Sequence, residues 1–182
     1  MGNIFLVGMM GSGKTTLGRA LAHRLDMEFV DTDRVLVERT GVPVATIFEI
    51  EGEEGFRRRE SAVLAEVAGR EGVVVATGGG AVLSAENREF MRAHGTVVYL
   101  RARLDGLWER TRHDATRPLL QTPDPRATLA AILAVREPLY REVAHVTVDT
   151  GAQSASTLVT RVLAALRKAE APAVERRPEG GP

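Results

Sequence analysis

Short, wholly apolar runs alternate along this chain with longer stretches in which apolar residues recur at the spacing of an α-helix. The apolar runs predict β-strands at residues 4–7, 28–30, 73–76, 96–100 and 143–148. Helical patterns occupy most of residues 14–25, 33–69, 84–94, 104–111, 127–141 and 156–169. Strands that are apolar at every position are typical of a parallel sheet buried on both faces. The alternation therefore predicts an α/β protein with three layers, α/β/α, around a five-stranded parallel sheet.

The first strand runs directly into a glycine-rich segment, residues 8–16. It fits the phosphate-binding pattern G-x-x-x-x-G-K-[ST], with Gly8, Gly13, Lys14 and Thr15 in the fixed places. Glycines let backbone amides turn towards one anion, and the helix that follows adds its positive dipole. Lys14 is expected to reach the β- and γ-phosphates, and the Thr15 hydroxyl to sit on Mg²⁺. The strand before it and the helix after it favour a phosphate loop over a glycine-rich turn without a ligand.

Composition adds mainly exclusions. The 182 residues carry a formal net charge of zero, so no overall field recruits nucleic acid or a membrane surface, and neither is an expected partner. The chain has no cysteine, which removes disulfides and thiolate metal sites. Residues 1–170 are expected to form a single domain in a cytoplasmic monomer. Residues 171–182, rich in Pro, Gly, Arg and Glu, are expected to be a disordered tail.

Two arginines and a glutamate fall where helical spacing predicts apolar residues. Glu60 lies inside the apolar stripe of the helix expected over residues 56–67, where a carboxylate needs a partner. Arg57, three residues earlier, is the candidate partner, although a solvated helix face would also explain it. Arg58 points away from the stripe and is expected to be solvated. Arg136 lies along the apolar face of the helix expected over residues 127–141, so it either meets an anion or extends outwards to water.

Other polar residues follow the strands of the predicted sheet, whose carboxyl ends should open onto one crevice. Asp31 and Asp33 follow the second strand; strand alternation would point both to one side, and the alternative is a turn or a helix cap. Beside a phosphate loop, one could serve Mg²⁺ while the other accepts a hydroxyl proton. Residues 78–80, three glycines, permit close approach of a ligand, although a flexible turn would look the same. Arg117 lies in a proline-rich stretch, residues 113–125, expected to be an exposed loop. Loop arginines are usually solvated, but a loop that closes over ATP could bring this one to the transferring phosphoryl group. Pro138 is expected to interrupt the helix that carries Arg136.

The ordered set of these segments resembles the shikimate kinase family over residues 2–168. The matching segments are residues 8–16, 31–33, 56–60, 78–80, 117–120 and 136–140. The resemblance implies a phosphate-loop kinase fold with a mobile lid at about residues 112–125. It also implies transfer of the γ-phosphoryl group of ATP to the 3-hydroxyl of shikimate, in the pathway to chorismate and the aromatic amino acids.

The resemblance assigns site residues position by position. Shikimate would be held by Asp33, Arg57, Gly79, Gly80 and Arg136, with the two arginines gripping its carboxylate. ATP would be bound by Gly11, Ser12, Gly13, Lys14, Thr15, Thr16, Arg110, Arg117 and Gln153. Gln153 stands where some members of the family carry arginine. One Mg²⁺ per subunit would be held by Thr15, with Asp31 acting through water. The catalytic residues would be Lys14, Asp33 and Arg117.

Two alternative functions share the phosphate loop. Another small kinase, for gluconate or a nucleoside monophosphate, would share the fold and the ATP site but would not need Arg57 and Arg136 beside residues 78–80. A non-catalytic, nucleotide-dependent binding module is the second alternative. Guanine specificity usually comes with an Asn-Lys-x-Asp segment, and the chain contains none.

Overall fold

A computed structural model describes residues 2–114 and 117–170, so the tail expected at residues 171–182 lies outside the described residues. Within the described ranges, one fully parallel sheet contains β1 (Asn3–Val7), β2 (Glu28–Asp31), β3 (Val73–Ala76), β4 (Gly95–Ala102) and β5 (Val146–Thr150). The strand order is β2-β3-β1-β4-β5, which places β1 at the centre. The five-stranded parallel sheet predicted from the apolar runs is confirmed.

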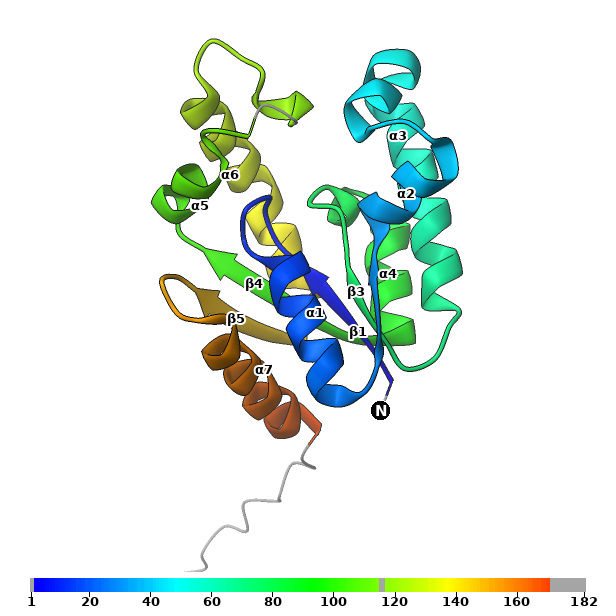
Figure 1. The fold of residues 1–182 in the computed structure, drawn as a ribbon, viewed down its shortest axis with the longest axis vertical. Helices are drawn as coiled ribbons and strands as arrows, with labels where there is room; N and C mark the ends of the chain where they lie inside the picture. The colour runs from blue at the N-terminus through cyan, green and yellow to red at the C-terminus, as the bar shows by residue number, and fades with distance from the viewer. Residues whose placement is uncertain (1, 115–116, 171–182) are drawn as a thin grey trace, which may run out of the picture.

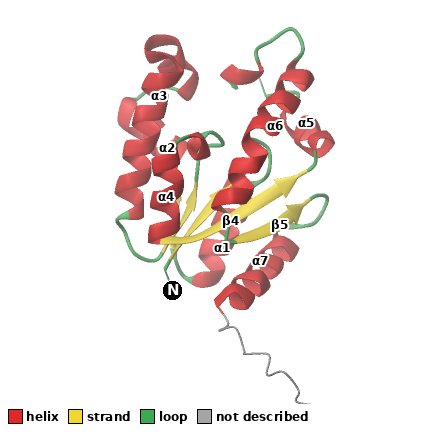
Figure 2. Ribbon diagram, turned by 180° about the vertical axis from the view of Figure 1, so that it is seen from behind, coloured by secondary structure: helices red, strands yellow, loops and turns green. Residues whose placement is uncertain are grey.

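Helices cover both faces of the sheet (Figures 1 and 2). One face carries α1 (Lys14–Leu25) and α7 (Ala155–Glu170), and these pack against each other and on the strands. The opposite side carries α2 (Thr32–Thr40), α3 (Val44–Ala68), α4 (Ala85–His94), α5 (Leu104–Thr111) and α6 (Pro125–Val143). The two apolar cores take alternate residues of β1: Phe5 and Val7 face one, Ile4 and Leu6 the other. This two-sided burial explains why the strand is apolar throughout. Across the described residues, every helix is too short or too polar to cross a lipid bilayer.

The carboxyl ends of three neighbouring strands meet at one edge of the sheet. In the parallel register, Leu6 of β1 and Asp31 of β2 both pair with Ala76 of β3, so the chain leaves the three strands at nearly the same level. The segments that follow are the phosphate loop, the start of α2 and residues 78–80. Helical elements rise on both sides of this edge, α2 and α3 on one side and α5 and α6 on the other (Figure 1). Open α/β sheets bind ligands at such a point.

Three local expectations need correction. The helix α6 continues through Pro138. A proline removes one backbone donor, and buried residues on both sides of it, Arg136 and Tyr140, hold the helix against the core. The last strand begins at Val146, because Val143 is the buried last residue of α6. In the stretch expected to be an exposed loop, Pro118–Leu120 form a 3₁₀ turn, and Leu120 is only 7% exposed.

The helix α1 approaches β2 closely because of Gly18. A Cβ at this position would clash with the ring of Phe29 and lie 3.1 Å from Leu6 Cδ1. The absence of a side chain therefore lets the first turn of α1 sit beside the end of β2, where Thr15 and Asp31 meet.

We expect Gly18→Ala to lower the free energy of unfolding by roughly 1–3 kcal/mol, because the methyl group overpacks the contact with Phe29. Helix propensity alone predicts the opposite sign. Gly106→Ala in α5 is the matched control, since the nearest atom to its Cβ would be Arg110 Nη2 at 3.4 Å. The control should gain up to about 1 kcal/mol. Urea unfolding of both variants measures the difference, and an unchanged or raised stability of Gly18→Ala would contradict the close packing.

Candidate active site

The phosphate loop is built from glycines in the left-handed region of backbone conformation. Gly8, Gly11 and Gly13 have φ of 145°, 76° and 96°. The loop is also pressed against its surroundings: a Cβ at Gly8 would lie 2.7 Å from the backbone oxygen of Leu100, and one at Gly11 would lie 2.8 Å from Thr111 Cγ2. A side chain at Gly8 or Gly11 would therefore be excluded for two reasons: the positive φ would strain its backbone, and its Cβ would clash with neighbouring atoms. The conformation leaves the amides at the start of α1 available to an anion.

Lys14 closes over this loop. Its ammonium donates hydrogen bonds to the backbone oxygens of Gly8, at 2.8 Å, and Met9, at 2.9 Å. Burial lowers the pKa of Lys14 to about 8, an effect that the carboxylate of Asp33 partly offsets. Burial in low-dielectric surroundings therefore raises the free energy of the charged ammonium. A phosphate group bound beside it would favour the charged form.

Thr15 and Asp31 bring two oxygens together beside the loop. Thr15 Oγ1 donates to Asp31 Oδ2 at 2.7 Å. Asp31 Oδ1 accepts from the backbone N–H groups of Asp33 and Arg34, which makes Asp31 the N-cap of α2 as well. A hydroxyl and a carboxylate are ligands that suit Mg²⁺, which usually keeps several waters and takes substrate phosphate oxygens as its remaining ligands. Among the described residues, no cluster of three or more His, Asp or Glu side chains could hold a metal ion.

Asp33 lies in the first turn of α2 and not on an extension of β2. The expectation that Asp31 and Asp33 point to the same side of an extended strand is therefore wrong, because the helix begins at Thr32. Its Oδ1 is buried and has no hydrogen-bond partner among the described residues. Burial first, and the nearby Asp31 next, raise the pKa of Asp33, against the attraction of Lys14. A carboxylate with a raised pKa and a free oxygen can accept the proton of a hydroxyl group.

The inward carboxylate of α3 is paired as expected. Glu60 is 1% exposed, and its Oε2 accepts a hydrogen bond from Arg57 Nη1 at 2.7 Å. Burial raises the pKa of Glu60, and the Arg57 charge opposes the shift. The Arg57 guanidinium also lies 5.1 Å from the centre of the Phe56 ring. Arg58, by contrast, is 68% exposed beside Glu54, so its expected solvated position is confirmed.

Arg136 is buried without a carboxylate of its own. The residue is 5% exposed on α6 and does not extend outwards to water. Among the described residues it forms no ion pair, whereas Arg57 has Glu60. Its guanidinium borders the cavity described below. A buried guanidinium in this state is a strong site for an anionic ligand.

Two of the three glycines that follow β3 make room for a charged group, and the third, Gly79, lies beside one. A Cβ at Gly78 would clash with the Glu60 carboxylate, and one at Gly80 would clash with the Arg57 guanidinium. A Cβ at Gly79 would lie 3.5 Å from Arg136 Nη1. The segment is also held in place, since Gly78 N–H donates to Thr32 Oγ1 at 3.0 Å. It is therefore a fixed platform on which three charged side chains converge, and not a flexible turn.

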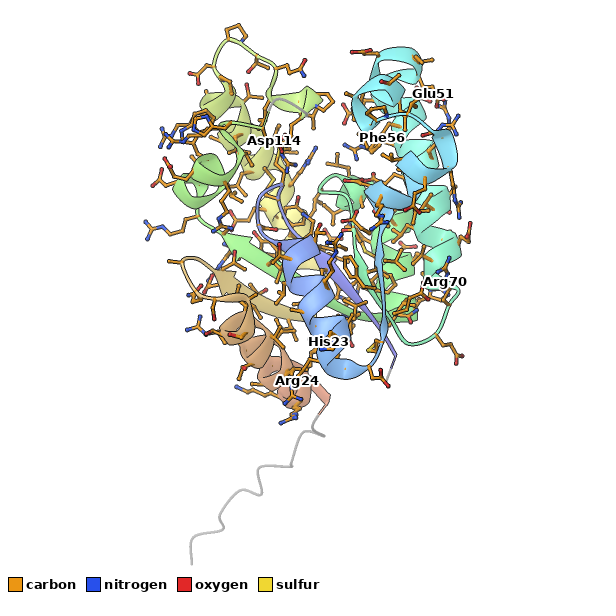
Figure 3. The ribbon with its side chains drawn as sticks, viewed as in Figure 1. His23, Arg24, Glu51, Phe56, Arg70 and Asp114 are labelled. Carbon is orange, nitrogen blue, oxygen red and sulfur yellow. The ribbon has the colours of Figure 1, made fainter. Side chains whose placement is uncertain are left out.

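These groups surround a cavity of about 230 Å³. It lies between α3, which carries Phe56, and the segment after α5, which carries Asp114 (Figure 3). Its charged lining consists of Asp33, Arg57, Glu60, Arg117 and Arg136. No sequence pattern predicted the apolar walls of the cavity, where Phe56 is joined by Met10, Val44, Phe48, Pro118 and Leu119. Phe48 packs on Phe56 with ring centres 4.5 Å apart, across the bend that Gly52 makes in α3.

The remaining expected ATP residues lie around the phosphate loop to different extents. Arg117 lines the cavity, with its Nε 2.8 Å from Asp114 Oδ2. Arg110 donates to the backbone oxygen of Gly11 at 2.7 Å, so α5 is anchored on the loop. Gln153 is exposed in the β5–α7 turn, where its Oε1 accepts from Gly151 N–H, and the described structure records no contact between it and the loop. Ser12 is buried within the loop, and Thr16 is exposed on the first turn of α1.

Comparisons with known proteins identify the family. The family model described as "Shikimate kinase" matches residues 10–167. The shikimate kinase of Nitrosospira multiformis is 61% identical over 153 residues, which cover 84% of this chain and 78% of that protein. That of Ralstonia nicotianae is 57% identical over 167 residues, covering 92% of this chain and 88% of that protein. The solved structure of the shikimate kinase from Acinetobacter baumannii in complex with shikimate has a TM-score of 0.91 and 46% identity, covering 93% of this chain and 95% of that one. With a phosphate loop and an arginine-lined cavity at one sheet edge, the chain belongs to the shikimate kinase family.

Proposed function

We propose that this protein transfers the γ-phosphoryl group of ATP to the 3-hydroxyl of shikimate, giving shikimate 3-phosphate and ADP on the way to chorismate and the aromatic amino acids. The observation that carries the proposal is the buried Arg136, which lacks a carboxylate partner among the described residues and faces a cavity beside the phosphate loop. An anionic, hydroxylated acceptor would satisfy it. Family membership and the likeness to a structure solved with shikimate support this choice of acceptor.

The acceptor would be held by its carboxylate and oriented by its ring. Arg57 and Arg136 both border the cavity, and guanidinium groups bind carboxylates through two parallel hydrogen bonds. The ring would pack on Phe48 and Phe56. Gly79 and Gly80 would let it approach the backbone closely.

The reaction needs positioning and charge neutralisation more than covalent catalysis by the protein. The 3-hydroxyl oxygen would attack the γ-phosphorus as the bond to the β-γ bridging oxygen breaks, and the departing hydroxyl proton would pass to Asp33. Lys14 would stabilise the charge on the β- and γ-phosphates. Arg117, on the proposed lid at about residues 112–125, would do the same for the transferring group. Mg²⁺, held by Thr15 with Asp31 acting through water, would supply further neutralisation when bound. Gly11, Ser12, Gly13 and Thr16 would bind the phosphates, and Arg110 and Gln153 would lie by the adenine.

We also propose a cytoplasmic monomer that acts on these two small substrates, without nucleic acid or membrane partners. One chain supplies every group of the proposed site, so no second copy is needed to complete it. The formal net charge of zero gives no general attraction to polyanions.

The proposed activity is tested by coupling ADP release to an optical readout with shikimate, gluconate and nucleoside monophosphates as acceptors. Release that depends on shikimate is expected. A gluconate or nucleotide kinase shares the phosphate loop, and its acceptor is also an anion, so the acceptor on which ADP release depends separates the three activities. Absence of shikimate-dependent ADP release would overturn the proposal, and absence with every acceptor would favour the non-catalytic nucleotide-binding module.

We expect Arg136→Ala to raise the shikimate KM by roughly 10- to 150-fold, because a charged hydrogen-bonding partner of the carboxylate is lost. The ATP KM should change far less. Arg58→Ala is the matched control, since this arginine is 68% exposed. Steady-state kinetics with each substrate varied in turn provide the comparison, and equal increases in both KM values would contradict a carboxylate-binding role.

We expect Arg117→Ala to lower kcat by about 10³-fold or more, as for other arginines that stabilise a transferring phosphoryl group. Arg112→Ala, which removes a half-exposed arginine of the same segment, should leave kcat nearly unchanged. Single-turnover rates at saturating ATP and shikimate separate the chemical step from product release. Near-wild-type rates for Arg117→Ala would remove this residue from the mechanism.

We expect kcat/KM for ATP to fall as the pH rises past about 8, because the Lys14 pKa is lowered to about 8 and only the protonated amine attracts phosphate. The free protein's pKa appears in kcat/KM, so a profile from about pH 6 to about pH 10 measures it directly. Lys14→Arg, whose charge persists, should lose this alkaline limb even if its overall activity is lower. An alkaline limb that persists in Lys14→Arg would assign it to another group.

A further inference from the structure

Tyr140 is a buried phenol that the proposed mechanism does not use. It lies on α6 one helical turn after Arg136, with no exposed surface. Its ring stacks on that of Tyr99 in β4, with centres 5.1 Å apart and an angle of 23° between the planes. Its hydroxyl donates a hydrogen bond to the backbone oxygen of Gly79 at 2.5 Å. One face of α6 therefore carries both a cation that borders the cavity and a fixed donor to the glycine platform.

The Gly79 carbonyl depends on this donor more than its neighbours do. Gly78 N–H is held by Thr32 Oγ1, and the oxygens of Gly78 and Gly80 accept from the 3₁₀ turn that follows. Within the described residues, the Tyr140 hydroxyl is the single hydrogen-bond donor to the Gly79 oxygen. Without it, the Gly79 carbonyl would be left unpaired, and its peptide plane would be free to turn.

A small turn at Gly79 would disturb the region where the two substrates meet. A Cβ there would lie 3.4 Å from the Gly8 oxygen, 3.5 Å from Met10 N and 3.5 Å from Arg136 Nη1. Gly79 thus lies between the phosphate loop and the carboxylate-binding arginine. Burial raises the pKa of Tyr140 above its ordinary value, so the phenol stays protonated and remains a donor at neutral pH.

We propose that Tyr140 is a positioning residue for the acceptor: its hydroxyl fixes the Gly79 peptide, which in turn sets the gap between Arg136 and the phosphate loop into which shikimate fits. This inference rests on the proposed function. Tyr140 touches neither substrate in the proposed arrangement, so its effect is on the binding of shikimate and not on the chemistry at phosphorus.

The test compares Tyr140→Phe with Tyr99→Phe. Tyr140→Phe keeps the ring and its stacking but leaves the Gly79 oxygen unpaired. We expect the shikimate KM to rise roughly 5- to 20-fold, while the ATP KM changes less than about twofold. Tyr99→Phe removes a hydroxyl from the same stacked pair, and this hydroxyl does not bond to Gly79 in the described structure. Both KM values of the control should stay near those of the wild type.

Several outcomes would overturn the inference. These are an unchanged shikimate KM in Tyr140→Phe, equal increases in both KM values, and a matching shikimate effect in Tyr99→Phe. Thermal melting of each variant shows whether the fold is retained at the assay temperature. If Tyr140→Phe does not fold, 3-fluorotyrosine at position 140 retains a slightly stronger donor, and a raised shikimate KM with this variant would contradict the inference. A wild type without shikimate-dependent ADP release would instead overturn the proposed function itself.

Discussion

The burial of the Arg136 guanidinium is the constraint around which the site is arranged. A buried ion is strongly disfavoured unless a partner compensates for its lost hydration. Arg57 has Glu60, and Arg117 has Asp114, but Arg136 forms no ion pair among the described residues. In the part of the chain that the structure describes, the free protein therefore buries this positive charge without an ion-pair partner, as it does that of Lys14, which bonds to the backbone oxygens of Gly8 and Met9. This imbalance selects an anionic acceptor, and the small cavity limits its size.

The Arg136 guanidinium can hold an acceptor next to a phosphate donor only because the sheet brings it close to the phosphate loop. Three strands end at nearly the same level, and the segment after β3 is the one nearest the centre on the acceptor side. Its glycines have no side chains, so Glu60, Arg57 and Arg136 approach from two helices and converge above the backbone. A parallel sheet thus supplies the common edge, and the missing side chains of Gly78 and Gly80 supply the space. Donor and acceptor subsites follow from the same backbone geometry.

The sequence predicts those parts of the site that depend on local spacing. The phosphate loop can be predicted because it depends on a fixed motif of consecutive residues. The inward position of Glu60 can be predicted because a carboxylate interrupts the apolar stripe of a helix. Contacts between distant elements leave no such pattern. Phe48 lines the cavity only because α3 bends at Gly52, and Tyr140 reaches Gly79 across 61 residues of sequence. The predicted start of the last strand, at residue 143, is wrong for a related reason. Val143 is apolar because it is buried at the end of a helix, and a residue buried in a strand would be apolar as well.

The pKa shifts of Lys14 and Asp33 have the same first cause, burial, and opposite signs. Burial disfavours the charged form of each, so both ionised groups are held in the free protein at a cost. Phosphate groups placed beside Lys14 would favour its ammonium form, and a hydroxyl donating to Asp33 would supply the partner that its buried oxygen lacks. Occupation of both subsites would therefore give each of these buried charged groups a partner, on either side of the reaction centre. Binding of a phosphate donor lowers the free-energy cost of burying the Lys14 ammonium, and binding of a hydroxyl acceptor lowers the cost of burying the Asp33 carboxylate. The buried charges therefore favour occupation of the site by both substrates.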